Sequence, residues 1–432
     1  MADPLWQKAN ASAPGADVQA YLAGDDVALD DHLLPFDITA TIAHVRGLAR
    51  IGMLSESDCQ TLCTALRKLE ELHASGAFVL DSRFEDGHSA IEWFLSQELG
   101  ELGRRVHLGR SRNDQVLAAQ RLYMMHAIEK IETSARVTAS VSLDLAEQHV
   151  DTIMPGYTHL QRAVPSTLAL WAAGHAEGFL DSAQLLHDTA VWLSASPLGT
   201  AAGYGVNLPL DRQGVADELG FARLLVNPLA AQNSRGKFEH QALAACYAVM
   251  SDVRRMTWDL SLFASQEFGF VRFDDEVSTG SSIMPNKRNP DLAELMRAAP
   301  AVVAGAMAEL QSLLGLPSGY HRDLQLTKEP VIRGLTMTQR TCALLPTLLG
   351  ACTWQTEIMK SAVDASMLAT DRAVELAAAG MPFRDAYQQV AEELAKDGLP
   401  AELSAEASIQ LRISAGACAN LMLDALRKRL RS

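Results

Sequence analysis

The sequence predicts an all-α protein built around long, closely packed helices, and three observations lead to that prediction. The composition is 48% hydrophobic but only 6% aromatic, which favours helices packed on helices. We find no alternating pattern with hairpin turns that is long enough to build a sheet. Two long stretches, 115–150 and 237–268, contain neither Gly nor Pro. At 1.5 Å per residue, the first would form a helix about 54 Å long.

The apolar residues in these stretches have helical spacing. Met124, Ile128, Ile131 and Ala135 step by four, three and four positions and form one stripe. Residues 166–179 are apolar almost all round, as expected of a helix buried in a bundle, and Gly174 and Gly178 there suggest close helix contact. Helices of this length need several partners. We therefore expect a long-helix bundle that continues across subunits.

A chain of 432 residues is too long for one simple core and predicts several domains. We place an N-terminal helical domain at residues 1–108, the central long-helix bundle at 109–355 and a small C-terminal helical domain at 356–432. The last contains the segment 380–384, Gly-Met-Pro-Phe-Arg, which we expect to break two helical stretches apart.

Charge and cysteine usage exclude some classes of function. The net charge of −15 argues against a nucleic-acid or anionic-membrane partner, although local cations can still bind an anionic substrate. The six cysteines form no C-x-x-C pair, and their spacing suits neither zinc nor a disulfide framework. No signal peptide and no apolar run long enough to cross a bilayer is evident, so a reduced, cytoplasmic compartment is expected.

Four separated segments are rich in side chains that could carry chemistry. In 85–92, His88 and Glu92 are four apart and could share a helix face. They could bind a metal, although no third ligand is evident, or His88 could be a solvated or hydrogen-bonded histidine without a metal. In 107–115, two arginines and Asn113 precede a long helix. There Asp114 could act as a cap, and the arginines could clamp a carboxylate.

The third segment, 155–162, contains a Pro-Gly pair that predicts a turn holding Thr158 and His159 before a buried helix. That histidine could transfer protons or be structural. The fourth, 280–291, reads Gly-Ser-Ser-Ile-Met-Pro-Asn-Lys-Arg-Asn-Pro-Asp. It could hold a hydroxyl, a cation and an amide where a carboxylate docks, or be an ordinary polar loop. Pro290 suits the first turn of the following helix, which carries Glu294.

The string at 280–291 resembles the signature of the fumarase/aspartase superfamily. Within that superfamily, Arg-Ser-Arg-Asn-Asp-Gln at 110–115, Gly-Tyr-Thr-His-Leu-Gln-Arg at 156–162 and Gly-Leu-Pro-Ser-Gly-Tyr at 315–320 resemble the argininosuccinate lyases. The resemblance covers nearly the whole chain, from about residue 32 to residue 384. It implies a central bundle of five long helices per subunit, a homotetramer with a core of about twenty helices, and active sites built from three subunits.

The resemblance also implies the reaction, in which L-argininosuccinate is cleaved to L-arginine and fumarate without a metal or a redox cofactor. Ser281 would be the general base and His159 the general acid, oriented by Glu294. Lys287 and Asn289 would stabilise the aci-carboxylate intermediate. The remaining residues that the resemblance assigns to substrate binding or its support are Arg112, Asn113, Thr158, Tyr320, Gln325, Lys328, Asp86 and His88.

The chain departs from the pattern of the family at a few positions. Only Leu5 and Trp6 remain of the usual opening, and Asp26 stands where many members have a substrate-binding serine. Ile91 replaces an asparagine and Leu108 a threonine. These departures leave the acid and the base in place but affect the grip on the amino-acid end of the substrate. The alternatives are a fumarate-releasing lyase of another N-substituted aspartate, or a catalytically silent structural homologue.

Overall fold

The computed structural model describes residues 15–81, 83–396, 399 and 404–431, and helices dominate it, so the predicted all-α class is confirmed. Leu5 and Trp6 lie outside the described residues. The chain divides into two compact units. Unit 1 contains the residues up to 130 together with 186–246 and 302–337, and unit 2 contains 131–185, 247–301 and the residues from 338 onward. The division into three domains at residues 1–108, 109–355 and 356–432 stays a prediction.

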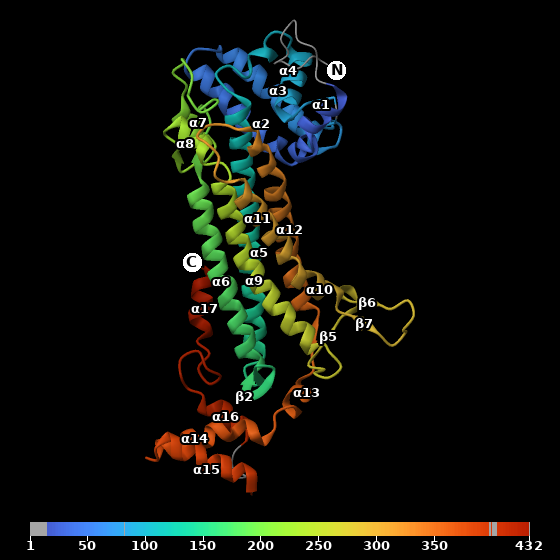
Figure 1. Ribbon diagram of the computed structural model, residues 1–432, viewed down its shortest axis with the longest axis vertical. Helices are drawn as coiled ribbons and strands as arrows, with labels where there is room; N and C mark the ends of the chain where they lie inside the picture. The colour runs from blue at the N-terminus through green and yellow to red at the C-terminus, as the bar shows by residue number, and fades with distance from the viewer. Residues whose placement is uncertain (1–14, 82, 397–398, 400–403, 432) are drawn as a thin grey trace. The chain divides into compact units, whose positions relative to one another are not determined.

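The N-terminal part of unit 1 is a packed group of helices (Figure 1). Their bounds are α1 Ala16–Ala23, α2 Asp26–Arg50, α3 Glu56–Ala74, α4 Gly87–Leu99 and the 3-10 turn η1 Gly103–Arg105. Side chains such as Ile38, Leu62 and Ile91 are fully buried between them. Ser55 caps α3 by accepting the Asp58 N–H, and Asp86 caps α4 by accepting the Ser89 N–H. The apolar core therefore fixes where α4 presents its polar first turn.

The helices that follow include α5 Arg112–Gln148, α6 Leu168–Leu193, α9 Lys237–Phe263, α11 Pro300–Leu313 and α12 Lys328–Gly350. The helix predicted from the stretch 115–150 is confirmed by α5. Its predicted apolar stripe is also confirmed, since Met124, Ile128 and Ile131 are fully buried and Ala135 is 1% exposed. The second predicted stretch ends early, because the chain turns after Phe263 and the Phe270 N–H returns to its carbonyl.

These helices pack closely inside each unit. In unit 1, a Cβ on Gly334 of α12 would lie 2.6 Å from a methyl of Leu243 on α9, so a larger residue there would force the Leu243 side chain to move. In unit 2, Ser182 of α6 donates to Asp252 of α9 at 2.6 Å. Gly178 faces the same carboxylate, with 3.3 Å between a built Cβ and its oxygen, whereas nothing lies within 4 Å of Gly174. Close packing is therefore confirmed at one of the two glycines.

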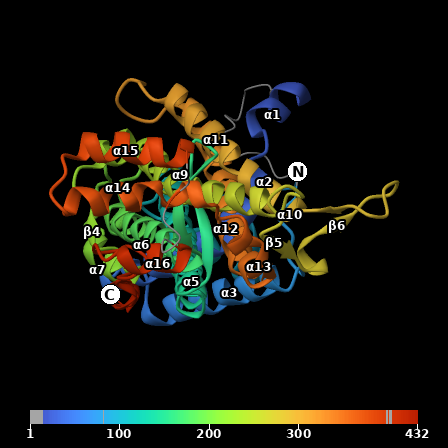
Figure 2. The ribbon, with the colours of Figure 1, turned by 90° about the horizontal axis from the view of Figure 1, so that it is seen from below.

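The remaining helices lie in both units. In unit 1 they are α7 Arg212–Glu218, α8 Pro228–Asn233 and η3 Arg322–Thr327; in unit 2 they are η2 Asp275–Val277, α10 Asp291–Ala298, α13 Thr356–Ser361, η4 Ala365–Leu368, α14 Ala369–Ala378, α15 Phe383–Lys396, α16 Ala405–Leu411 and α17 Leu423–Arg431. The predicted breaker at 380–384 separates α14 from α15. These two helices lie side by side (Figure 2), joined by the ion pair of Arg372 and Glu393 at 3.4 Å.

Short two-stranded sheets, which the sequence pattern did not reveal, connect the helices. Their pairs are β1 Ile153–Thr158 with β2 Gln161–Thr167, β3 Ala195–Ser196 with β4 Arg223–Leu224, β5 Val271–Phe273 with β8 Cys352–Trp354, and β6 Thr279–Gly280 with β7 Arg288–Asn289. All are antiparallel except β3–β4. Hairpins β1–β2 and β6–β7, both in unit 2, carry two of the four chemistry-bearing segments.

All six cysteines are free thiols. A search of the described residues for a helix of sufficient length and hydropathy to cross a membrane finds none.

Candidate active site

The loop between β6 and β7 holds Ser281 in a specific backbone setting. The Ser281 Oγ accepts hydrogen bonds from the Met284 N–H at 3.1 Å and the Ile283 N–H at 3.3 Å. The pairing of Thr279 with Asn289 closes the hairpin, and the Thr279 hydroxyl donates to Asp291. Two N–H donors aimed at one hydroxyl oxygen favour its ionised form over the neutral one.

The other predicted residues of this segment flank the hairpin. Lys287 is exposed, and its N–H closes a turn onto the Met284 carbonyl at 3.1 Å. Asn289 lies in β7, and Glu294 lies on α10, where it pairs with Arg297 at 3.2 Å. Pro290 precedes α10 at the cap position, one residue before the first turn predicted for it. The segment therefore presents a serine, a lysine and an amide around one loop.

The turn that carries His159 differs from the prediction. Pro155 and Gly156 lie inside strand β1, with an irregular register there, so the predicted Pro-Gly turn is wrong. The chain reverses at His159 and Leu160, whose φ angles of +55° and +58° are left-handed. Thr158 and His159 are both exposed at this tip. Left-handed φ values at two consecutive residues are those of a tight hairpin turn, whereas Gly156 keeps an extended strand conformation.

Within the described residues of one chain, His159 makes no hydrogen bond or ion pair with Ser281, Lys287 or Glu294. Hairpin β6–β7 extends away from the helices of unit 2 and from hairpin β1–β2, as both views show (Figures 1 and 2). The structure thus does not bring the predicted acid and the predicted base together within one chain, and their roles stay a prediction.

A second group of predicted residues lies in unit 1, at the start of α5. The Ser111 Oγ accepts the Asn113 N–H at 3.3 Å and so caps the helix. Arg112 forms ion pairs with Glu85 at 2.9 Å and with Asp86 at 3.3 Å. Burial lowers the pKa of Arg112, but the two carboxylates outweigh that effect and raise it overall. This arginine therefore remains a cation beside the first turn of α4.

Asp114 completes the cap of α5, as predicted. One carboxylate oxygen accepts the Ser111 N–H at 2.9 Å. The other accepts the N–H groups of Gly199 and Ala201, each at 2.9 Å. Its side chain is fully buried, so it ties α5 to a loop of the same unit and is not accessible to a ligand.

His88 is fixed by a buried chain of hydrogen bonds that includes Gln115 and Asp37. The Gln115 side-chain N–H donates to both oxygens of Asp37, at 2.7 and 2.9 Å. The side-chain oxygen of Gln115 must then accept a hydrogen bond from His88 Nδ1, 2.5 Å away. Neutral His88 therefore keeps an unprotonated Nε2. Burial lowers the pKa of His88 to about 4 and raises the pKa of Asp37 to about 6.

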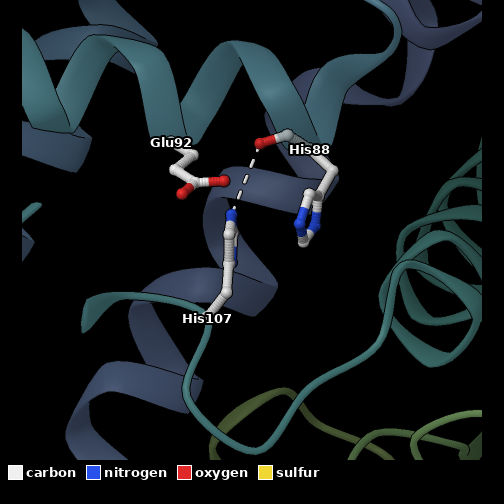
Figure 3. Close-up of side chains that lie close together, drawn as sticks. All are labelled: His88, Glu92 and His107. Carbon is white, nitrogen blue, oxygen red and sulfur yellow. Dashed lines mark hydrogen bonds between the residues drawn. The ribbon is translucent and has the colours of Figure 1, made fainter. Parts of the chain in front are cut away.

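His88, Glu92 and His107 form a group whose potential ligand atoms lie within 4.8 Å of one another (Figure 3). His107 is thus the third potential ligand that the sequence did not reveal. Its ring stacks on His88 with centroids 3.7 Å apart. Its Nε2 reaches the His88 carbonyl at 3.3 Å, and its Nδ1 accepts from Arg110 at 2.6 Å. Both ring nitrogens of His107 are thus used in hydrogen bonds, and its ring is stacked on that of His88. Hydrogen bonding therefore describes this group better than shared coordination of a metal.

Lys328 lies between two carboxylates of α2. Its Nζ is 2.9 Å from Oδ1 of Asp26 and 2.6 Å from Oδ1 of Asp30. The Gly87 N–H donates to the other oxygen of Asp30, Oδ2, at 2.9 Å. Asp30 was not among the predicted residues. The available signal was its spacing, since Asp26 and Asp30 are four apart and share one face of a helix.

Tyr320 and Gln325 belong to the same unit. The Tyr320 ring lies 5.3 Å from the guanidinium of Arg235, which is 6% exposed and was not predicted from sequence. Gln325 donates to the Leu22 carbonyl at 3.1 Å. The loop before Tyr320 is held by the Gly319 N–H, which donates to Asn233 at 3.0 Å.

Two of the departures from the family pattern are now located. Ile91 is fully buried in the apolar core under α4, so it contacts neighbouring side chains and not a ligand. Leu108 is 40% exposed, and its carbonyl accepts from His44 at 3.0 Å.

Two cavities of unit 2 adjoin hairpin β1–β2. One, of about 250 Å³, is mostly apolar and is lined by residues that include Tyr157, Trp171 and Phe268. The other, of about 290 Å³, is lined in part by Thr158 and Arg412.

Comparison with known proteins identifies relatives along the whole chain. The model of a family described as lyase matches residues 1–305. An argininosuccinate lyase of Sorangium cellulosum is 53% identical over 426 residues, covering 99% of this chain and 98% of that protein. An argininosuccinate lyase of Stenotrophomonas maltophilia is 49% identical over 429 residues, covering 99% of each chain.

Solved structures show the same fold at lower identity. An EDDS lyase in complex with formate matches with a TM-score of 0.79 at 21% identity, over 97% of this chain and 91% of that one. A class II fumarase from Schistosoma mansoni matches with a TM-score of 0.71 at 15% identity, over 89% of this chain and 94% of that one.

Proposed function

The chain belongs to the argininosuccinate lyase family of the fumarase/aspartase superfamily, and from this premise we propose that it cleaves L-argininosuccinate to L-arginine and fumarate. Near-full-length identity of about 50% to enzymes of that name carries the proposal. The positions that the reaction needs are occupied by suitable side chains, namely Ser281, Lys287, Asn289, His159 and Glu294.

Ser281 is the proposed base. The reaction removes a weakly acidic proton from the succinate carbon next to a carboxylate, and a serine hydroxyl is a weak base unless it is ionised. The hydrogen bonds that its Oγ receives from the N–H groups of Ile283 and Met284 support the ionised form. As the proton leaves, negative charge builds on the substrate carboxylate, and Lys287 and Asn289 stabilise the resulting dianion.

His159 is the proposed acid, which protonates the departing guanidino nitrogen as the carbon–nitrogen bond breaks. Its exposed position on the β1–β2 turn leaves the ring accessible. Glu294 supports the cationic form of the ring in this scheme. Because Glu294 pairs with Arg297 of its own helix in the single chain, we propose that the histidine it orients belongs to another copy of the chain.

The residues of unit 1 form the proposed substrate-binding face. Arg112 and Asn113 lie at the start of α5, with Asp86 and His88 supporting them from α4, and Thr158 adjoins the acid in unit 2. Tyr320, Gln325 and Lys328 lie on the segment that leads into α12. Their charges and hydrogen-bonding groups suit a substrate that carries carboxylates at one end and an amino-acid group at the other.

We further propose that the active enzyme is a cytoplasmic homotetramer whose sites draw residues from three subunits. The separation of His159 and Ser281 on two hairpins of one chain supports shared sites. The side chains of Leu160 and Ile283, 66% and 86% exposed beside these residues, support burial against neighbouring copies. Six free thiols fit a reducing compartment.

Release of fumarate tests the proposed function. The purified full chain is mixed with L-argininosuccinate, fumarate is followed by its ultraviolet absorbance, and arginine is quantified in the same sample. Equal amounts of both products are expected. An enzyme that releases no fumarate at micromolar concentration contradicts the proposal. Turnover of adenylosuccinate or aspartate with higher kcat/KM identifies a related lyase instead.

A further inference from the structure

The cavity of about 250 Å³ beside hairpin β1–β2 has an aromatic lining, to which the proposed function assigns no role. Its rings belong to Tyr157 of β1, Trp171 of α6, Phe263 at the end of α9, and Phe268 in the segment that follows. The ring centroids of Tyr157 and Phe268 are 5.3 Å apart, and those of Trp171 and Phe263 are 5.8 Å apart. Aromatic walls of this kind hold the hydrocarbon part of a ligand and attract a cation to the faces of their rings.

Asp259 of α9 is the only charged side chain among the described residues that line this cavity. Its Oδ2 accepts a hydrogen bond from Trp171 Nε1 at 2.9 Å and lies 3.3 Å from His175 Nε2. Its Oδ1 accepts no hydrogen bond from any residue that the structure describes, and no described lysine or arginine pairs with the carboxylate. The side chain is 36% exposed. The carboxylate therefore has one oxygen held by the cavity wall and one oxygen open to a ligand.

The combination of aromatic rings and an open carboxylate oxygen is complementary to an organic cation. A guanidinium group suits it better than an ammonium group, because guanidinium is planar, stacks on aromatic faces and is more weakly hydrated. The volume is slightly below the range of about 300–1,000 Å³ that is common for ligand pockets, so the ligand must be small.

We propose that this cavity binds a small aliphatic guanidinium compound, whose charged group bonds to Oδ1 of Asp259 and whose alkyl chain lies on the aromatic rings. This binding goes beyond the proposed function and requires neither Ser281 nor His159. It is measured without turnover, so its outcome is independent of whether the chain releases fumarate.

Two probes of nearly the same shape isolate the charge. Butylguanidinium and the neutral butylurea are titrated separately into the purified full chain, as it assembles in solution, and binding is followed by isothermal titration calorimetry. One site per chain is expected, with a Kd at least about 10-fold lower for butylguanidinium, as expected for a hydrogen bond between charged groups. Asp259→Asn keeps the size of the side chain but removes its charge. It should bring the two Kd values to within about threefold by weakening the binding of the cation.

Glu267→Gln is the matched control. It removes an exposed carboxylate next to Phe268 that does not line the cavity, and it should retain the wild-type ratio of Kd values. Wild-type protein that binds neither probe, or both equally, overturns the inference without any variant. An Asp259→Asn protein that keeps the wild-type unfolding midpoint and the wild-type ratio places the cation elsewhere and also overturns it.

Discussion

The hydroxyl of Ser281 accepts two backbone N–H groups from residues that follow it in the same loop. A neutral serine gains little from two such donors, whereas an alkoxide gains a charge-assisted hydrogen bond from each. Under the proposed function, these donors would supply part of the pKa shift that a serine base needs, and the cation of Lys287 would supply more. This arrangement depends on the backbone of the loop, because both donors are main-chain N–H groups.

Replacing Ser281 by Ala should lower kcat for argininosuccinate by a factor of about 10³ or more, because no base remains to remove the proton. Ser282→Ala is the matched control, since it removes an adjacent hydroxyl that is exposed, and it should keep most of the activity. Fumarate absorbance gives the rate, and size-exclusion chromatography checks assembly. An assembled Ser281→Ala enzyme with near-normal turnover would refute the assignment of the base.

The buried imidazole of His88 makes stability depend on pH. Its pKa is about 4 in the folded chain and about 6.5 when unfolded, so the unfolded state binds a proton first as pH falls. The folded state therefore loses about 2 kcal/mol between pH 7 and pH 5 from this group. Asp37, with its pKa raised to about 6, acts in the opposite direction, because the folded state takes up its proton first.

His88→Gln separates the two contributions. Urea unfolding at pH 7 and pH 5, at one fixed protein concentration, should show that wild type loses about 2 kcal/mol more than the variant over this interval. His32→Gln, which removes an exposed imidazole, sets the baseline. Parallel pH dependence of wild type and His88→Gln would mean that His88 is not held neutral by burial.

At the residue scale, the sequence indicated candidate site residues but not the side chains that pair or hydrogen-bond with them. The string at 280–291 made Ser281 and Lys287 candidates because its residue types are specific, and their roles stay a prediction. The carboxylates that hold Lys328 and the chain from His88 to Asp37 were not foreseen as partners. Each joins helices far apart in sequence, and no local spacing encodes such a contact. Asp30 was the exception that helical spacing could have revealed.

At the element scale, helices were predicted more reliably than hairpins. The helix α5 followed from a long stretch without Gly or Pro, and its buried stripe from apolar spacing. Hairpin β1–β2 was missed because its strands mix polar residues with Pro and Gly, and because its turn is His159-Leu160 and not one of the Asn-Gly or Asp-Gly pairs that usually mark a hairpin. Non-local pairing decides these strands, so their composition gave no signal.

The C-terminal helix α17 is held to unit 2 by arginines. Arg427 pairs with Asp144 and Glu147 of α5, and Arg429 with Glu177 and Asp181 of α6. These pairs are partly exposed, so each is expected to contribute less than about 1 kcal/mol. Their loss should free the helix without unfolding the chain.

The double variant Arg427→Ala/Arg429→Ala should therefore show faster hydrogen exchange over residues 423–431, with little change in the global unfolding midpoint. Lys428→Ala, which removes an exposed charge from the same helix, serves as control and should exchange like wild type. High salt should narrow the difference between wild type and the double variant, since it screens exposed pairs. Unchanged exchange in the double variant would show that apolar contacts hold α17.

At the scale of the whole molecule, the proposed function requires residues from both compact units of the chain. The two compact units each hold part of the predicted site, with Arg112 and Lys328 in unit 1 and Ser281 and His159 in unit 2. A sequence can identify such residues, but it does not state which copy of the chain supplies each one. The proposed sharing of the site between subunits would be a property of assembly, which a local pattern along one chain does not reveal.

Reassembly of two inactive enzymes tests the shared site most directly. Ser281→Ala and His159→Asn tetramers are mixed, dissociated and allowed to reassemble, and fumarate release is measured. With the acid and the base supplied by different subunits, random mixing restores both residues in about a quarter of the sites, so activity should return to about that fraction of wild type. Mixed tetramers, proven by native mass spectrometry, that remain inactive would contradict a site in which these two residues come from different chains.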